Sequence, residues 1–198
     1  LCLKTIDEIK RQARQNGFNS FHFSLSGGEP TFHPGYLDIL KYLSDDVSNT
    51  NFTSIHMTSN CSRPLGWFAR YVEYAKPFHR ASITASLHTE HVSTQNDLDA
   101  FATKLEYCQS YDIQITVNMV MVPDYFERDW ENALYLHKRG INVTLKPQSD
   151  PTASRVVDGY TSSQLETLHN GMPQRAYTEK KRVWADRPLP KFELTQAI

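Results

Sequence analysis

The sequence lacks an excess of charge of either sign. Its 21 lysine and arginine residues stand against 22 aspartate and glutamate residues, which leaves a formal net charge of −1. A protein that holds nucleic acid or an anionic membrane through its overall field needs a strong cluster of basic charge, and no run of like charge here is long enough to provide one. We therefore expect neither nucleic acid nor a membrane surface among its partners.

Cysteines and long apolar runs are also scarce. The three cysteines, Cys2, Cys61 and Cys108, form no C-x-x-C pair and no even set, so neither a disulfide framework nor a structural zinc site is expected. The longest apolar runs, such as 117–123, fall far short of the roughly 20 residues that span a bilayer. These absences favour a soluble cytoplasmic protein, and 39% hydrophobic residues suffice for one large folded domain.

What the sequence does contain is a regular alternation of strand-like and helix-like segments. Apolar β-rich runs begin near Ser20, Thr53, Ala81, Asp112 and Asn142. Helical spacing of apolar residues predicts helices over 5–16, 35–43, 65–74, 97–110 and 125–139, the first of them opening with a capping-box pattern at Thr5. Such alternation is typical of βαβ units, in which parallel strands lie side by side with helices outside.

Each predicted strand is apolar on one face and polar on the other. The polar face carries His22, Ser24, Ser26, His56, Thr58, Ser82, Thr84, Ser86, His88, Gln114, Thr116, Asn118, Asn142, Thr144 and Lys146. Burying such groups without partners would cost about 1 to 3 kcal/mol each, so this face must meet water or a ligand. A closed eight-stranded barrel has an apolar interior instead. The pattern predicts an α/β fold, a partial, open (β/α)6-type barrel with mostly parallel strands; an exposed sheet face in an antiparallel α+β fold is the alternative.

The first predicted strand ends in Ser26-Gly27-Gly28-Glu29-Pro30. Two glycines at the carboxyl end of a parallel strand let the backbone turn at positive φ and bring bare N–H and C=O groups against a ligand. In this setting the segment resembles the Gly-Gly-Glu motif of radical S-adenosylmethionine (radical SAM) enzymes, which have a partial barrel with the ligand in its lumen. The resemblance extends from residue 5 to about 147, as five of six expected βα units.

The resemblance implies S-adenosylmethionine as a cofactor. The turn of Gly27, Gly28, Glu29 and Pro30 would hold the amino group of its methionine moiety through the backbone. Asn60 lies in a segment similar to the family's Thr-Asn-Gly element, with Cys61 where glycine is usual.

Later strands carry looser matches to the same family. Ser86 and His88 match a strand position that meets the ribose or the carboxylate, and Asn118 lies in a segment similar to the one that passes the adenine. We expect His22, Lys146 and Gln148 to meet the substrate.

The family's chemistry also needs a [4Fe-4S] cluster. A C-x-x-x-C-x-x-C loop holds it, because three thiolates leave one iron open to S-adenosylmethionine. No such triplet occurs in the 198 residues, so we expect the first barrel strand and the cluster loop to lie upstream of residue 1 or to be absent. No residue is assigned as a metal ligand, although Cys2 is a candidate; Cys61 and Cys108 are expected in the core. The chain alone is expected to bind S-adenosylmethionine weakly and to make no radical.

The function implied by the resemblance is that of a radical SAM enzyme. It would generate a 5′-deoxyadenosyl radical that abstracts hydrogen from a small-molecule or peptide substrate, with electrons from a reductant protein such as flavodoxin or ferredoxin. Two alternatives stay open. A divalent-metal-dependent barrel lyase or isomerase would use His22, His56, His88 and His91 with Glu29 or Glu90. A non-catalytic domain would keep the barrel and bind a partner.

The alternating pattern dissolves after Pro147. Loop-forming residues dominate 148–159, and a short helix capped by Thr161 or Ser162 is predicted up to Asn170. We therefore expect residues 1–148 to form the barrel and residues 149–198 to form a C-terminal loop and helix extension.

Overall fold

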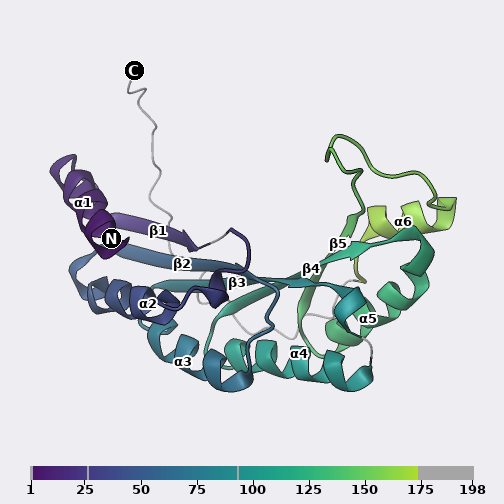
Figure 1. Cartoon of the computed structure of the whole chain (residues 1–198), viewed down its shortest axis with the longest axis horizontal. Coiled ribbons are helices and arrows are strands. Elements are labelled where there is room, and N and C mark those ends of the chain that lie inside the picture. The colour runs from purple at the N-terminus through teal and green to yellow at the C-terminus, as the bar shows by residue number, and fades with distance from the viewer. Residues whose placement is uncertain (1, 26, 93, 174–198) are drawn as a thin grey trace.

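Five parallel strands form the sheet of this protein. A computed structural model describes residues 2–25, 27–92 and 94–173. The strands are β1 (Ser20–Leu25), β2 (Phe52–Ser59), β3 (Arg80–Leu87), β4 (Gln114–Met121) and β5 (Asn142–Pro147). Their order in the sheet, β1-β2-β3-β4-β5, is also their order in the chain (Figure 1). The edges, β1 and β5, do not pair with each other, so the sheet stays open.

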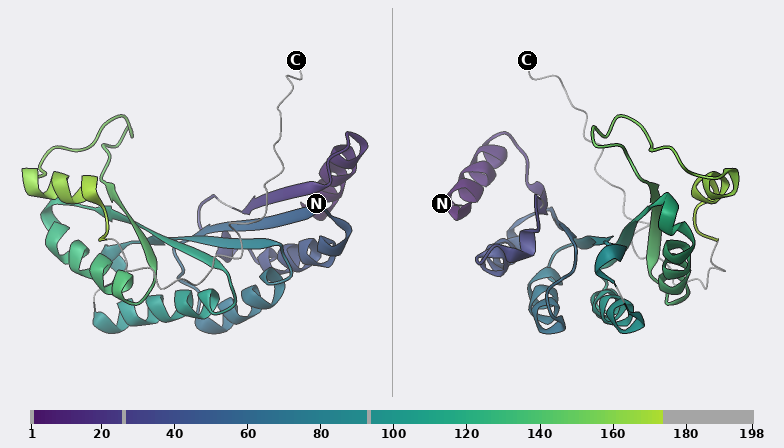
Figure 2. Two further views of the ribbon diagram at one scale, coloured as in Figure 1. Left: turned by 180° about the vertical axis from the view of Figure 1, so that it is seen from behind. Right: turned by 45° about the vertical axis from the view of Figure 1, so that its right-hand side comes forward.

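Helices connect successive strands. They are α2 (Tyr36–Asp45), α3 (Leu65–Ala75), α4 (Gln95–Gln109) and α5 (Phe126–Lys138), while α1 (Cys2–Gln15) precedes β1 and α6 (Ser162–Asn170) follows β5. Figure 2 shows the sheet curved like a trough, with α2 to α5 along its convex side. This arrangement confirms the predicted α/β fold with an open, partial barrel of parallel strands.

The convex face of the sheet packs against these helices and forms the core. Alternate residues of the three central strands, Ile55, Met57, Ile83, Ala85, Val117 and Met119, are at most 1% exposed. Leu40, Phe68 and Leu105 meet them from the helices and are fully buried. Each large aliphatic or aromatic side chain so buried contributes about 1.5 to 3 kcal/mol. Because this face supplies the packing, the concave face is available for polar side chains.

The parallel register arranges the polar side chains of the concave face in rows across the strands. His56 on β2 lies opposite Ser82 on β3. Nearer the carboxyl ends, Ser86 on β3 lies opposite Asn118 on β4, which lies opposite Thr144 on β5. These side chains are partly or fully exposed, whereas their apolar neighbours along each strand are largely buried. The predicted polar lumen is therefore present.

Two helix starts differ by two or more residues from the sequence-based expectation. Helix α1 already includes Cys2, so the predicted N-terminal cap at Thr5 is wrong, because Thr5 lies within the first turns. Helix α4 begins at Gln95 rather than at Asp97, because Thr94 is its N-cap and the Asp97 side chain closes a capping box back onto Thr94. The predicted cap of α6 at Thr161 is confirmed, with Gln164 completing the box.

The segment after β5 packs against the barrel. Ser149 pairs with Val156 in an antiparallel bridge, and Tyr160 and Leu168 are partly buried against the core. Residues 174–198 of the predicted extension lie outside the described residues, and the division at residue 148 stays a prediction. Among the described helices, none combines the length and the apolar character needed to cross a bilayer.

Candidate functional site

The candidate site begins in the turn that follows β1. Gly27 and Gly28 both adopt positive φ, +104° and +55°, a conformation that favours glycine. A Cβ atom at either position would meet no atom within 4 Å, so the backbone of the turn faces open space. Its peptide groups are therefore accessible to a ligand. Ser26, the preceding residue of the motif, lies outside the described residues.

The Glu29 carboxylate ties this turn to the end of β2. Its Oε1 accepts hydrogen bonds from the hydroxyls of Ser59 at 2.8 Å and Thr31 at 2.6 Å, and its Oε2 accepts one from the backbone N–H of Asn60 at 2.6 Å. It also caps the short 3-10 helix η1 (Pro30–Phe32), accepting from the Thr31 N–H at 3.1 Å.

These hydrogen bonds set the charge state of Glu29. Partial burial acts to raise the pKa of the carboxyl, but hydrogen bonds from Thr31, Asn60 and Ser59 outweigh that effect, so its pKa lies below the usual 4.5. The ionised side chain therefore positions two loops, while the backbone of the glycine turn stays open.

Two cations, one in the loop after β2 and one on α4, donate hydrogen bonds to the same loops. Arg63 donates from Nε and Nη2 to the Thr31 carbonyl oxygen, at 3.0 and 2.9 Å, and its guanidinium stacks over the Phe32 ring at 4.8 Å. Lys104, on α4, donates to the carbonyl oxygen of Cys61. These contacts fix the end of β2 against the turn after β1.

Cys61 occupies a position whose backbone suits glycine. Its φ is +55° and its side chain is 1% exposed. The left-handed conformation agrees with the match of this residue to the glycine of the Thr-Asn-Gly element. Asn60 beside it is exposed, and its Oδ1 accepts a hydrogen bond from the Ser62 N–H at 2.9 Å.

The other predicted cofactor residues follow on β3 and β4. Ser86 and Asn118 are register partners on the concave face, so the structure brings them together. His88, just past β3, instead lies beside Glu90, with Nδ1 3.5 Å from Oε1 and both side chains more than half exposed. His88 therefore belongs to the loop surface at the mouth of the barrel.

The three predicted substrate residues do not gather at one place. Lys146 is exposed near the carboxyl end of β5, opposite Val120. Gln148 contacts Tyr160 through its backbone, because its N–H donates to the Tyr160 hydroxyl at 2.8 Å. His22 lies near the start of β1, at the other end of the lumen, where its Nδ1 is 2.7 Å from Ser54 Oγ.

A hollow of about 480 Å³ opens beside His22, at the amino-terminal end of the lumen. Its lining comprises His22, Phe52, Ser54, His56, Arg80, Ser82, Ile83, Thr84, Gln114 and Thr116. Sequence reasoning missed Ser54 and Arg80, although each shares strand parity with a predicted lumen residue two positions later. The hollow is separate from the glycine turn.

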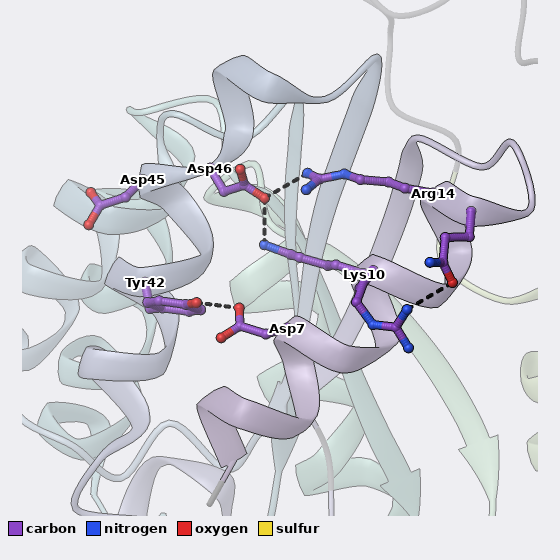
Figure 3. Close-up of a pocket in the computed structure, with 8 residues that line it drawn as sticks. Asp7, Lys10, Arg14, Tyr42, Asp45 and Asp46 are labelled. Carbon is purple, nitrogen blue, oxygen red and sulfur yellow. Dashed lines mark hydrogen bonds and ion pairs between the residues drawn. The ribbon is translucent and has the colours of Figure 1, made fainter.

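A second hollow, of about 660 Å³, lies between α1 and α2 (Figure 3). Several of its polar groups are paired across the two helices: Lys10 Nζ and Arg14 Nη2 lie 2.9 and 3.0 Å from Asp46 Oδ2, and Tyr42 donates to Asp7. Lys10 is only 4% exposed. These contacts hold α1 against α2, so we assign this hollow to helix packing.

The described residues do not fit an iron–sulfur cluster. Among the side chains that the structure describes, no three His, Cys, Asp or Glu residues form a metal-binding group. Cys61 and Cys108 are at most 1% exposed, and burial raises the pKa of each thiol to about 12. A cluster ligand must be an accessible thiolate, which neither provides. The side chains of Cys2 and His91 lie outside the description.

Two histidines of the divalent-metal alternative have serine partners. His22 Nδ1 contacts Ser54, and His56 Nδ1 lies 2.8 Å from Ser82 Oγ. Of the two proposed carboxylate ligands, Glu29 is engaged by the two loops and Glu90 lies beside His88 on the surface. No observation on the described residues favours a divalent-metal enzyme.

The fold and the glycine turn define an open α/β barrel with an accessible backbone turn at the carboxyl end of its first strand. The chain belongs to the radical SAM superfamily, whose family model matches residues 3–136, from α1 to within α5. No curated protein and no solved structure matches it. Membership supports S-adenosylmethionine and iron–sulfur radical chemistry in general terms.

Proposed function

We propose that this chain forms the S-adenosylmethionine-binding core of a radical SAM enzyme. The observation that carries the proposal is the turn after β1. Its two positive-φ glycines present open backbone, and the Glu29 carboxylate beside them binds the end of β2. The turn lies within the residues matched by the family model.

The residues present would hold the cofactor along the carboxyl ends of the strands. The backbone of Gly27 and Gly28, kept in place by Glu29, would receive the amino group of the methionine moiety. Asn60, Ser86 and Asn118 would line the path toward the nucleoside. With its cluster, the cofactor supplies a 5′-deoxyadenosyl radical that abstracts hydrogen from a small-molecule or peptide substrate.

Cofactor binding, rather than cofactor cleavage, is the activity we assign to the described residues themselves. The family's cluster needs three accessible thiolates, which these residues do not contribute. Cleavage also needs an electron donor, for which a flavodoxin or a ferredoxin is our proposal.

Ligand-observed NMR with millimolar S-adenosylmethionine tests the proposal, because it detects weak binding without the cluster. We expect saturable binding by the wild-type chain and an at least tenfold loss of affinity in Gly27→Ala, since an L side chain strains the turn at φ +104°. Gly66→Ala, at an exposed helical glycine without positive φ, is the matched control and should bind normally.

Two results would contradict the proposal. One is wild-type protein that shows no saturable binding of S-adenosylmethionine, the outcome that a non-catalytic barrel-derived domain predicts. The other is a folded Gly27→Ala variant whose affinity equals that of Gly66→Ala. Circular dichroism of both variants distinguishes lost binding from lost folding.

A further inference from the structure

We infer that the hollow at the amino-terminal end of the lumen binds an anionic group, a carboxylate or a phosphate, through Arg80 and the imidazoles of His22 and His56. The further assignment of this anion to the substrate of the radical reaction rests on the proposed function. The binding of an anion in this hollow is independent of the proposed function. The hollow measures about 480 Å³, within the range of small-molecule sites.

The ionisable side chains that line the hollow are all basic. Arg80 enters from β3, His22 from β1 and His56 from β2, and none of the described lining residues is an aspartate or a glutamate. Arg80 donates from Nε to the amide oxygen of Gln114 at 3.0 Å, a neutral partner. Its Nη groups can therefore form the forked contact that guanidinium makes with carboxylate or phosphate.

Two serines hold the imidazoles in matching positions. His22 and Ser54 are register partners on β1 and β2, and His56 and Ser82 are register partners on β2 and β3. In both pairs the ring nitrogen Nδ1 faces the serine hydroxyl, at 2.7 and 2.8 Å. Ser54 is 6% exposed, so its position is set by packing. The repeated pair keeps the rings from turning freely.

The electrostatics of the hollow favour a negative ligand. Burial lowers the pKa of His56 below its usual value, and electrostatic interaction with the neighbouring His22 and Arg80 lowers it further. A positive charge on His56 is therefore repelled by that of Arg80. An anion placed among them relieves the repulsion and raises the pKa of His56.

Imidazole NMR signals of His56 provide the test, at constant ionic strength and without S-adenosylmethionine. Inorganic phosphate and acetate are titrated separately, with chloride as the reference. We expect a saturable shift and a higher pKa of His56 with at least one of the two anions. The anion that binds with the higher affinity shows whether the hollow prefers a phosphate or a carboxylate. Because no cofactor is present, failure here leaves the glycine-turn experiment unaffected.

Charge variants complete the experiment. Arg80→Gln should lower the affinity for the anion at least tenfold. Arg80→Lys keeps the positive charge but loses the forked guanidinium contact, and it should lower the affinity less. Arg70→Gln removes an exposed arginine of α3 and should leave the affinity unchanged. The inference is overturned if both anions behave like chloride, or if folded Arg80→Gln binds them as tightly as Arg70→Gln.

Discussion

The carboxylate of Glu29 accepts a 2.6 Å hydrogen bond from the backbone N–H of Asn60, 31 positions later in the chain. This bond joins the loop after β1 to the loop after β2. Because Ser59 and Thr31 bond to the same side chain, the glycine turn is positioned before any ligand arrives. Preorganisation of this kind lowers the entropic cost of binding.

Replacing Glu29 by glutamine should loosen that junction. The amide keeps one oxygen, so its NH2 group must face either the Asn60 N–H or the donors of Thr31 and Ser59, and we expect a loss of about 1 kcal/mol in the free energy of unfolding. Urea denaturation at pH 7 measures it. Glu73→Gln, at an exposed glutamate of α3, is the control and should change stability by less than about half that amount.

The pH dependence of the wild-type protein gives an independent check on Glu29. Its folded pKa lies below the usual 4.5, so its contribution is present above that value and is lost as the pH falls through the folded pKa. The stability difference between wild type and Glu29→Gln should therefore shrink in acid. A constant difference from pH 7 to pH 3 would contradict the assigned role.

Cys61 allows a test of backbone strain. At φ +55°, replacement by glycine relieves a left-handed conformation that costs an L residue about 1 to 2 kcal/mol, although it removes a buried side chain. Cys61→Ala removes the sulfur and keeps the strain. We expect Cys61→Gly to be the more stable of the two by chemical denaturation; the reverse order would show that the side chain's packing dominates.

Thiol labelling tests the burial of Cys61 and Cys108. Since burial raises the pKa of each to about 12, only about one thiol in ten thousand is ionised at pH 8. In a Cys2→Ser variant, which isolates these two, Ellman's reagent should label no thiol in native buffer and both in urea. Rapid labelling of the native variant would overturn this description.

Tyr160 fastens the segment after β5 to the sheet. Its hydroxyl donates to the Met121 carbonyl oxygen at 2.5 Å and accepts from the Gln148 N–H at 2.8 Å. Tyr160→Phe leaves both partners without this bond and should cost about 1 to 3 kcal/mol. It should also speed hydrogen exchange at Gln148. Tyr125→Phe, at an exposed tyrosine, should do neither.

The fold was predictable because its two signals are local: strand-like and helix-like segments alternate along the chain, and polar and apolar residues alternate along each strand. The second alternation separated Ile83 and Ala85 from Ser82 and Thr84 and indicated a polar lumen. The exact ends of the helices were harder to predict. Thr94 caps α4 through Asp97, three residues later, yet Asp97 itself looked like the start.

The candidate site was predictable only in part. The glycine turn is a contiguous motif, so Gly27 and Gly28 stood out in the sequence. Two partners of Glu29, Ser59 and Asn60, lie about thirty residues away, and Arg63 acts through a loop carbonyl, so no periodic pattern connects them. Arg80 went unnoticed because it begins its strand as a single charged residue, and only the register places it across from Ser54.

The parallel register also fixes the distance between successive rows of polar side chains in the lumen. Ser82, in the row of His56, and Ser86, in the row of Asn118, are four residues apart on β3, about 13 Å at the usual rise of a strand. A molecule anchored by its charge at the first row reaches the second only if its carbon skeleton is long enough. Selection by length would then follow from strand geometry alone.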